Sequence, residues 1–227
     1  MVSGIYEAIT GGMFAEQRME IITNNLANVN TAGFKRDVLT FDEVLKEKQS
    51  TDLSQGGLNY TGNQLDVALG EKGFFKIQTD RGVRYTRNGS FLLDAENMLV
   101  TQNGNRVLGE NGPIQIKGTE IAISASGDVS VDKSHVATLS AVDFTHLNFL
   151  TKEGNSLYVY DDPKGEGSII DPDPISVKQG YLEASNVNPV EEMTRMIVTQ
   201  RAYESYVKIM QTFDEANSKL INEVGRL

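Results

Sequence analysis

The chain of 227 residues contains no cysteine. This absence excludes disulfide bonds, thiolate metal sites and cysteine nucleophiles, and it is compatible with any redox compartment. No apolar run approaches the roughly eighteen residues of a membrane-spanning helix. The first residues also lack the basic segment, apolar block and cleavage site of a secretory signal. We therefore expect neither a membrane span nor ordinary Sec secretion.

Concentrated basic charge is missing as well. The formal net charge is −10, with 31 Asp and Glu against 21 Lys and Arg, and the acidic residues are scattered along the chain. Binding to nucleic acid or to anionic lipid requires clustered Lys and Arg, so neither is an expected partner. A hydrophobic content of 39% with 23% charged residues is typical of a soluble protein that builds a core.

Residue patterns that carry chemistry are few. The two histidines, His135 and His146, have no companion at metal-ligand spacing. The segment from Asp128 resembles the start of a calcium loop, but Lys133 stands where glycine is needed and Leu139 where a glutamate is needed. No nucleophile elbow, phosphate-binding loop or zinc-protease motif is present. We therefore expect no catalytic, cofactor-binding or metal site, no small-molecule substrate and no enzymatic activity.

The N-terminal end carries apolar or small residues at alternating steps of three and four. This spacing marks the a and d positions of four successive heptads and predicts an amphipathic helix. We call these residues the first seam. They are Ile5, Ala8, Gly12, Ala15, Met19, Ile22, Leu26 and Val29.

The C-terminal end repeats the same spacing up to the last residue. Only two of its ten positions, Thr199 and Asn217, are polar, so a second amphipathic helix is predicted. We call these residues the second seam. They are Met196, Thr199, Tyr203, Tyr206, Met210, Phe213, Asn217, Leu220, Val224 and Leu227.

The two seams are complementary in size. Small residues such as Gly12 allow close helix approach, whereas bulky ones such as Tyr206 supply volume. One two-helix seam buries too little apolar surface to offset the conformational entropy lost in ordering both ends. We expect a coiled-coil-like layer that becomes ordered when other copies cover its remaining faces. The alternative is a pair of amphipathic helices packed on an ordinary core.

Between the two ends the pattern changes from helix to strand. The first helix should end near 28–33, and residues 37–50 retain a partly helical pattern. Residues 50–64 are polar and rich in glycine. From Leu65 onward, short alternating segments and turn pairs such as Asn103-Gly104 predict an all-β domain. The last helix should begin at Asn188-Pro189, with Asn188 as its N-cap.

These patterns predict an α+β fold whose helical ends form one inner layer. We assign 1–35 to the N-terminal helix and 36–64 to an extended connector. Residues 65–184 are assigned to a β-rich outer domain, and 185–227 to the C-terminal helix.

One long motif resembles a known family. Residues 24–36, Asn-Asn-Leu-Ala-Asn-Val-Asn-Thr-Ala-Gly-Phe-Lys-Arg, closely resemble the N-terminal signature of flagellar basal-body rod and hook proteins. Residues 73–77 and 85–91 look like the β-domain pattern of that family. Residues 180–188 and 200–204 look like its C-terminal pattern. The resemblance therefore covers both ends and the centre of the chain.

The resemblance implies a structural rod subunit in the periplasmic part of the flagellar basal body. It implies export through the flagellar type III apparatus and packing of both terminal helices in a tubular inner layer that transmits torque. The partners would be other copies of the chain and other rod proteins. Within the family, 58–69, 108–114 and 189–194 look most like the proximal-rod member. The connector is also shorter than the one that the resemblance implies for the distal-rod member. The distal-rod member is the alternative.

The predicted assembly residues are the two seams except Thr199, Asn217 and Leu227, together with Asn25 and Asn28. These two amides lie three residues apart, where they can bond to neighbouring chains or simply cap the helix end. On the β domain we predict Tyr85, Arg87 and Asn88 as contacts with a neighbouring copy, because tyrosine and arginine are enriched at interfaces. The alternative is that they form one face of a hairpin.

A function of another class is also open. The chain could be an exported protein whose β domain binds a cell-wall or surface ligand, with the helices serving only secretion and dimerisation. Self-assembly separates the two functions, since the second predicts a chain that stays monomeric at every concentration.

Overall fold

The computed structural model describes residues 2–41, 47–70, 72–162, 169–170 and 176–224. Within these ranges the structure describes the side chains of all residues except 2, 3, 40, 41, 47, 48 and 220–224. The chain divides into two compact units. Unit 1 comprises Met1–Val29, Asp37–Ser50 and Val187–Leu227, and unit 2 comprises Asn30–Arg36 and Thr51–Asn186. Each unit is described by itself.

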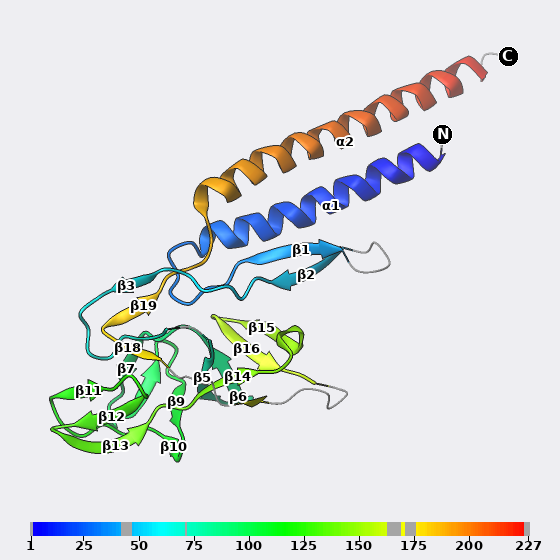
Figure 1. The fold of residues 1–227 in the computed structure, drawn as a ribbon. Coiled ribbons are helices and arrows are strands. Elements are labelled where there is room, and N and C mark those ends of the chain that lie inside the picture. The colour runs from blue at the N-terminus through cyan, green and yellow to red at the C-terminus, as the bar shows by residue number, and fades with distance from the viewer. Residues whose placement is uncertain (1, 42–46, 71, 163–168, 171–175, 225–227) are drawn as a thin grey trace. The chain divides into compact units, whose positions relative to one another are not determined.

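Unit 1 is built from the two ends of the chain (Figure 1). Helix α1 spans Val2–Ala27 and helix α2 spans Pro189–Val224, and the two helices pack side by side in opposite directions. Strands β1 (Asp37–Phe41) and β2 (Glu47–Thr51) form a two-stranded sheet, and β1 contacts α1. The predicted pairing of the chain's ends is therefore present within one chain.

Helix α2 begins as its sequence predicts. The Asn188 side-chain oxygen accepts hydrogen bonds from the amides of Val190 (3.1 Å) and Glu191 (3.4 Å), which satisfies two of the first free N–H groups. Pro189 takes the first helical position, where its missing N–H costs nothing. The prediction of Asn188 as the N-cap is confirmed.

The described residues of the segment 37–50 do not follow the predicted partly helical pattern, and 42–46 lie outside the described residues. Its described residues form β1 and most of β2. The predicted pattern came from the apolar residues Val38, Phe41, Val44 and Leu45. In the structure Asp37 is fixed at the start of β1 by Asn25 of α1. A tertiary contact therefore decides a locally ambiguous segment.

Unit 2 is rich in short antiparallel strands. Its large sheet runs in the order β15-β16-β6-β5-β9-β8-β7, with β10 added to β9, β14 to β5, and β17 to β14. A three-stranded sheet β11-β12-β13 and the pairs β18-β4 and β19-β3 complete it. The strands are β3 Leu58–Tyr60, β4 Val67–Leu69, β5 Phe74–Thr79, β6 Gly82–Thr86, β7 Phe91–Leu93, β8 Leu99–Thr101, β9 Arg106–Gly109, β10 Gly112–Pro113, β11 Ile121–Ile123, β12 Asp128–Val131, β13 Ser134–Thr138, β14 Ala141–Phe144, β15 Leu150–Gly154, β16 Leu157–Tyr160, β17 Ile169–Ile170, β18 Val177–Gln179 and β19 Tyr181–Glu183, with the short 3-10 helix η1 Leu147–Phe149 before β15.

Several turns lie where the sequence predicts them. Thr79 pairs with Gly82 across a two-residue hairpin loop, and Gly109 pairs with Gly112 across another. Gly104 has a φ of +78°, as the turn between β8 and β9 requires. The predicted α+β fold, with helical ends and a central antiparallel β domain, is confirmed.

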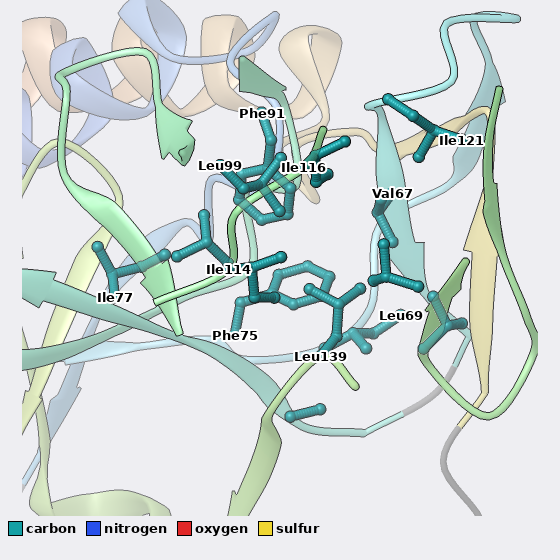
Figure 2. Close-up of a cluster of buried hydrophobic side chains, with 14 of the residues drawn as sticks. Val67, Leu69, Phe75, Ile77, Phe91, Leu99, Ile114, Ile116, Ile121 and Leu139 are labelled. Carbon is teal, nitrogen blue, oxygen red and sulfur yellow. The ribbon is translucent and has the colours of Figure 1, made fainter. Parts of the chain in front are cut away.

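The core of unit 2 is apolar and lies between its strands. Figure 2 shows Phe75, Phe91, Val67, Leu99 and Leu139 directed toward one another from separate strands and turns. A second cluster is mainly aromatic and is made by Phe74, Tyr85, Val142, Phe144, Leu150 and Tyr158. These clusters make unit 2 a scaffold with its own hydrophobic core.

Candidate functional site

The α1–α2 pair has a constant register. Gly4 lies against Phe213, Gly11 against Tyr206, and Asn25 against Glu192. Each step along α1 is matched by an equal step back along α2. Such a register over six turns is what a repeated heptad spacing produces in an antiparallel pair.

The seam residues face into this pair to different degrees. Ala8, Gly12, Ala15, Ile22 and Asn25 are buried, whereas Tyr203 is exposed. The side chains of Leu220, Val224 and Leu227 lie outside the described residues. The half-buried positions are Ile5, Met19, Leu26, Asn28, Val29, Met196, Thr199, Tyr206, Met210, Phe213 and Asn217. Their contact with other copies stays a prediction.

One close contact in the pair escapes the heptad pattern. A Cβ on Gly11 would lie 2.5 Å from the Tyr206 ring, whereas a Cβ on Gly12 would lie 3.9 Å from the Tyr206 Cβ atom. Gly11 is therefore the glycine that accommodates the ring. The heptad spacing alone predicts Gly12 as the position of close approach. The neighbouring glycine at position 11 was the sequence feature that could have indicated the contact with Tyr206.

Both helices also expose apolar side chains away from their shared seam. On α1 these are Tyr6, Ile9, Met13 and Phe14, and on α2 they are Val190, Met193, Ile197, Val198 and Ile209. Large apolar side chains exposed over one element are typical of surfaces that pack against another protein. Among the helices described, neither is long and apolar enough to cross a membrane.

Asn25 joins three elements of unit 1. Its amide nitrogen donates to the Asp37 carbonyl (2.9 Å), and its oxygen accepts from the Asp37 amide (2.8 Å). The same nitrogen lies 3.4 Å from Glu192 Oε2. Asn25 is 1% exposed, so its amide binds within the chain and not to a neighbour. The predicted intersubunit role is corrected for this residue.

Asn28 is placed differently. It is half-buried, and its amide nitrogen donates to the carbonyl oxygen (2.9 Å) and the side-chain oxygen (2.8 Å) of Asn24. This is the helix-end capping that was the alternative interpretation for the asparagines. Its contact with a neighbouring chain stays a prediction.

The second half of the signature segment belongs to unit 2. Gly33 has a φ of +66°, and a Cβ there would lie 2.4 Å from the Asn88 amide nitrogen. The Gly33 amide donates to the Glu183 carbonyl (2.7 Å). Glycine is therefore required both by the backbone conformation and by the close approach of another backbone.

Beside Gly33 lies a buried charged cluster, which we define as Lys35, Arg87 and Glu183. Lys35 Nζ is 2.5 Å from Glu183 Oε1, and Arg87 Nε is 2.9 Å from Glu183 Oε2. Lys35 Nζ also donates to the Ser54 carbonyl, and Arg87 Nη1 to the Gly73 carbonyl, both at 2.6 Å. The cluster thus fixes four separate segments of unit 2 to one carboxylate.

The electrostatics of the cluster follow from its burial. Removal from water lowers the pKa of the Lys35 ammonium, and the hydrogen bond and charge of Glu183 oppose the shift. Burial likewise lowers the pKa of the Arg87 guanidinium, again opposed by Glu183. Two cations share one carboxylate, so the loss of Glu183 would remove the contacting anion from both.

The predicted outer contact on the β domain is wrong for two of its three residues. Tyr85 is 6% exposed and belongs to the aromatic cluster, where its ring packs edge-on against Phe144 at 4.8 Å. Arg87 is 4% exposed and belongs to the charged cluster. Their side chains cannot reach a neighbouring copy because unit 2 covers them. For half-buried Asn88 the contact stays a prediction.

This geometry first defines a class of protein. A helical pair formed by both chain ends, with apolar side chains left open on each helix, is the construction of an assembly subunit. Three family descriptions match the chain: "Flagella basal body rod protein" over 5–35, "Flagellar hook protein FlgE/F/G D1 domain" over 68–131, and "Flagellar basal body rod FlgEFG protein C-terminal" over 178–223.

Relatives match over nearly the whole length. The flagellar basal-body rod protein FlgF of Caulobacter vibrioides is 32% identical over 247 residues, covering 100% of both chains. FlgG of Bacillus subtilis is 32% identical over 261 residues, covering 98% of this chain and 99% of FlgG. FlgF of Salmonella typhimurium is 31% identical over 240 residues, covering 95% of each. The chain belongs to the flagellar basal-body rod protein family, and it is a structural component of the flagellar basal body.

Proposed function

We propose that the chain is a subunit of the proximal rod, where it polymerises with other copies and transmits torque without catalysis or a cofactor. The observation that carries this proposal is the α1–α2 pair, whose register is constant while both helices keep apolar side chains exposed. The two helices pack regularly against each other, yet apolar side chains on their outer surfaces stay exposed to water. This supports a subunit whose exposed helix surfaces pack against helices of other subunits. Torque transmission needs such stiff, continuous packing.

The choice of the proximal over the distal position rests on length. The FlgF relatives named above align over 240 and 247 positions, whereas FlgG of Bacillus subtilis aligns over 261. The extra positions mean that more residues must be inserted to match FlgG. This difference supports the proximal position, as does the short connector between α1 and the central strands.

We further propose that the chain reaches the rod through the flagellar type III export apparatus. The partners are then other copies and other rod proteins, and they include neither nucleic acid nor a small-molecule substrate. The net charge of −10 and the scattered acidic residues support the exclusion of nucleic acid.

Basal bodies purified from flagellated cells that encode the chain test this function. A deletion strain complemented with the wild-type chain should contain it in the rod, and the deletion alone should prevent the distal rod from forming. Ala15→Leu should abolish incorporation because Ala15 is buried between the helices. Thr23→Leu, at an exposed polar position of the same helix that belongs neither to the seam nor to the exposed apolar side chains, is the matched control. Rods that form normally without the chain would refute the proposal.

A further inference from the structure

Asn186 joins three segments of unit 2 with one side chain. Its Oδ1 atom accepts a hydrogen bond from the Arg36 amide at 2.7 Å. Its Nδ2 atom donates to the Asp52 carbonyl at 2.9 Å, and to the carbonyl and hydroxyl oxygens of Ser54, both at 3.1 Å. The Asn186 backbone amide donates to the Phe34 carbonyl at 3.4 Å. Asn186 therefore connects the last residue of unit 2 to two segments near its beginning.

An antiparallel ladder leads from the core of unit 2 to Asn186. Strand β4 pairs with β18, and β3 pairs with β19, so the segments before β4 and after β18 run side by side. Beyond β3 and β19, the Ala184 amide donates to the Gly57 carbonyl at 2.7 Å. The contacts of Asn186 with Asp52 and Ser54 are the last step of this ladder within unit 2.

The core of unit 2 does not include these contacts. The buried residues of both hydrophobic clusters lie between Val67 and Val177. The large sheet is likewise built from strands that lie from β5 to β17 in the sequence. The ladder segments 52–60 and 181–186 flank this stretch on either side. The core can therefore form before the ladder reaches Asn186.

A segment near the start of unit 2 depends on residues at its end. Lys35 Nζ donates to the Glu183 carboxylate across 148 residues of sequence. The Arg36 amide donates to Asn186 across 150 residues. In this position Lys35 is 1% exposed and the neighbouring Phe34 is 6% exposed. Late residues therefore contribute to the burial of a segment that comes early in the chain.

Chain entropy favours one order in which these contacts form. In an unfolded chain, joining Arg36 to Asn186 closes a loop of 150 residues before other contacts stabilise it. Once the core has folded, β4 and β18 are already paired, and each further step of the ladder orders only a few residues. The favoured order is therefore the core first, the ladder second and residues 33–36 last.

We infer that Asn186 is a conformational latch that closes last, and that residues 33–36 stay open until the ladder has reached it. The N-terminal part of the chain is synthesised first, yet residues near the end fix it in place. A chain that stops before Glu183 would leave Lys35 and Arg36 accessible to proteases that cut after basic residues. The latch thereby distinguishes complete chains from incomplete ones. It is a property of the single chain and does not depend on the proposed function.

Refolding of the full chain tests the order of closure. The chain is refolded from urea and given short pulses of hydrogen exchange at increasing times, and the protected amides are identified by NMR. We expect the β5 and β6 amides to become protected first, and the amides of Gly33 and Arg36 to follow in a separate, slower phase. Protection of Gly33 and Arg36 together with β5 and β6, or before them, would overturn the inference.

Loss of the Asn186 side chain tests the latch itself. In the full chain, Asn186→Ala removes the side-chain hydrogen bonds to the two early segments. Trypsin cleavage after Lys35 and Arg36 should become about tenfold faster, because each lost bond makes local opening easier. The β5 and β6 amides should keep their exchange protection. Asn59→Ala is the matched control, since Asn59 is exposed on β3 of the same ladder, and it should leave the cleavage rate unchanged.

An unchanged cleavage rate in Asn186→Ala would overturn the latch, and so would equal acceleration in Asn59→Ala. Loss of β5 and β6 protection in Asn186→Ala would also overturn it, because Asn186 would then take part in folding of the core. Neither measurement uses rod assembly. Absence of the wild-type chain from basal bodies would therefore refute the proposed function and leave the latch in place.

Discussion

Lys35 Nζ lies 2.5 Å from Glu183 Oε1, although 148 residues separate them in the sequence. Lys35 follows the first helix, and Glu183 ends the last strand before the second helix begins. With Arg87 on the other carboxylate oxygen, the pair holds together segments from the beginning, middle and end of unit 2. A carboxylate so placed determines how those segments meet.

Glu183→Gln should destabilise unit 2 strongly. The amide removes the carboxylate charge that contacts both Lys35 and Arg87, and removal of one partner of a buried pair costs about 3–5 kcal/mol. Urea unfolding, monitored by hydrogen-exchange protection of the β5 and β6 amides, measures the loss of unfolding free energy. Glu153→Gln is the control, because Glu153 pairs with Arg81 and Arg84 near the surface and should change stability far less. Equal effects would contradict a structural role for the cluster.

Gly33→Ala should cost more than Gly104→Ala. Both glycines have a positive φ, +66° and +78°, so each alanine pays the left-handed backbone penalty of about 1–2 kcal/mol. Only at Gly33 would the new Cβ meet a backbone atom, Asn88 N at 2.4 Å, whereas nothing lies within 4 Å of Gly104. Thermal unfolding of the two variants measures the difference. If Gly33→Ala lowers the unfolding temperature no more than Gly104→Ala does, the backbone at Asn88 can move away from residue 33 without cost.

Asn25→Ala should weaken unit 1, and Asn28→Ala should hardly affect it. Loss of the Asn25 amide removes its two hydrogen bonds to the buried backbone N–H and C=O of Asp37, each of which contributes about 0.5–1.5 kcal/mol. The Asn28 amide nitrogen donates to Asn24 of the same helix end, which is partly exposed to water. Urea unfolding monitored by the helical circular dichroism signal compares the two. A larger loss of stability in Asn28→Ala than in Asn25→Ala would refute the structural role of Asn25.

Asp128→Asn should flatten the acid side of the stability profile. Hydrogen bonds from Ser126 and Thr138 hold the pKa of Asp128 below its ordinary value of 3.8. Because the folded pKa is the lower one, the stabilisation is present above the unfolded pKa and is lost as the pH falls through the folded pKa. Unfolding midpoints measured from pH 6 down to pH 2 should fall less steeply in this variant than in wild type. Asp80→Asn, in an exposed hairpin loop, controls for the change in net charge.

Local features of the fold could be predicted from the sequence. The heptad spacing defines the buried side of α1, the Asn188-Pro189 pair marks the start of α2, and turns such as that at Gly104 identify the β domain. Each of these depends on residues within a few positions of one another. The family signature likewise lies in continuous segments.

The remaining features depend on contacts between distant residues. Arginine and tyrosine are residue types that are common at interfaces. No nearby residue in the sequence indicates that Arg87 pairs with Glu183 or that Tyr85 packs against Phe144. The sequence alone places Asn25 near the end of a helix, where its amide could bond to a neighbouring chain. The contact with Asp37 becomes visible only in the folded structure. Side-chain burial is a tertiary property, so the sequence located the motif correctly but could not assign its residues to internal or external contacts.

An averaged electron cryo-microscopy map of basal bodies purified from cells that encode the chain tests the central claim most directly. The account predicts that side-chain density of this sequence can be traced in the proximal rod, with α1 and α2 packed against helices of neighbouring subunits through their exposed apolar side chains. A proximal rod whose density is fully explained by other proteins, or helices of this chain that touch no neighbour, would contradict it.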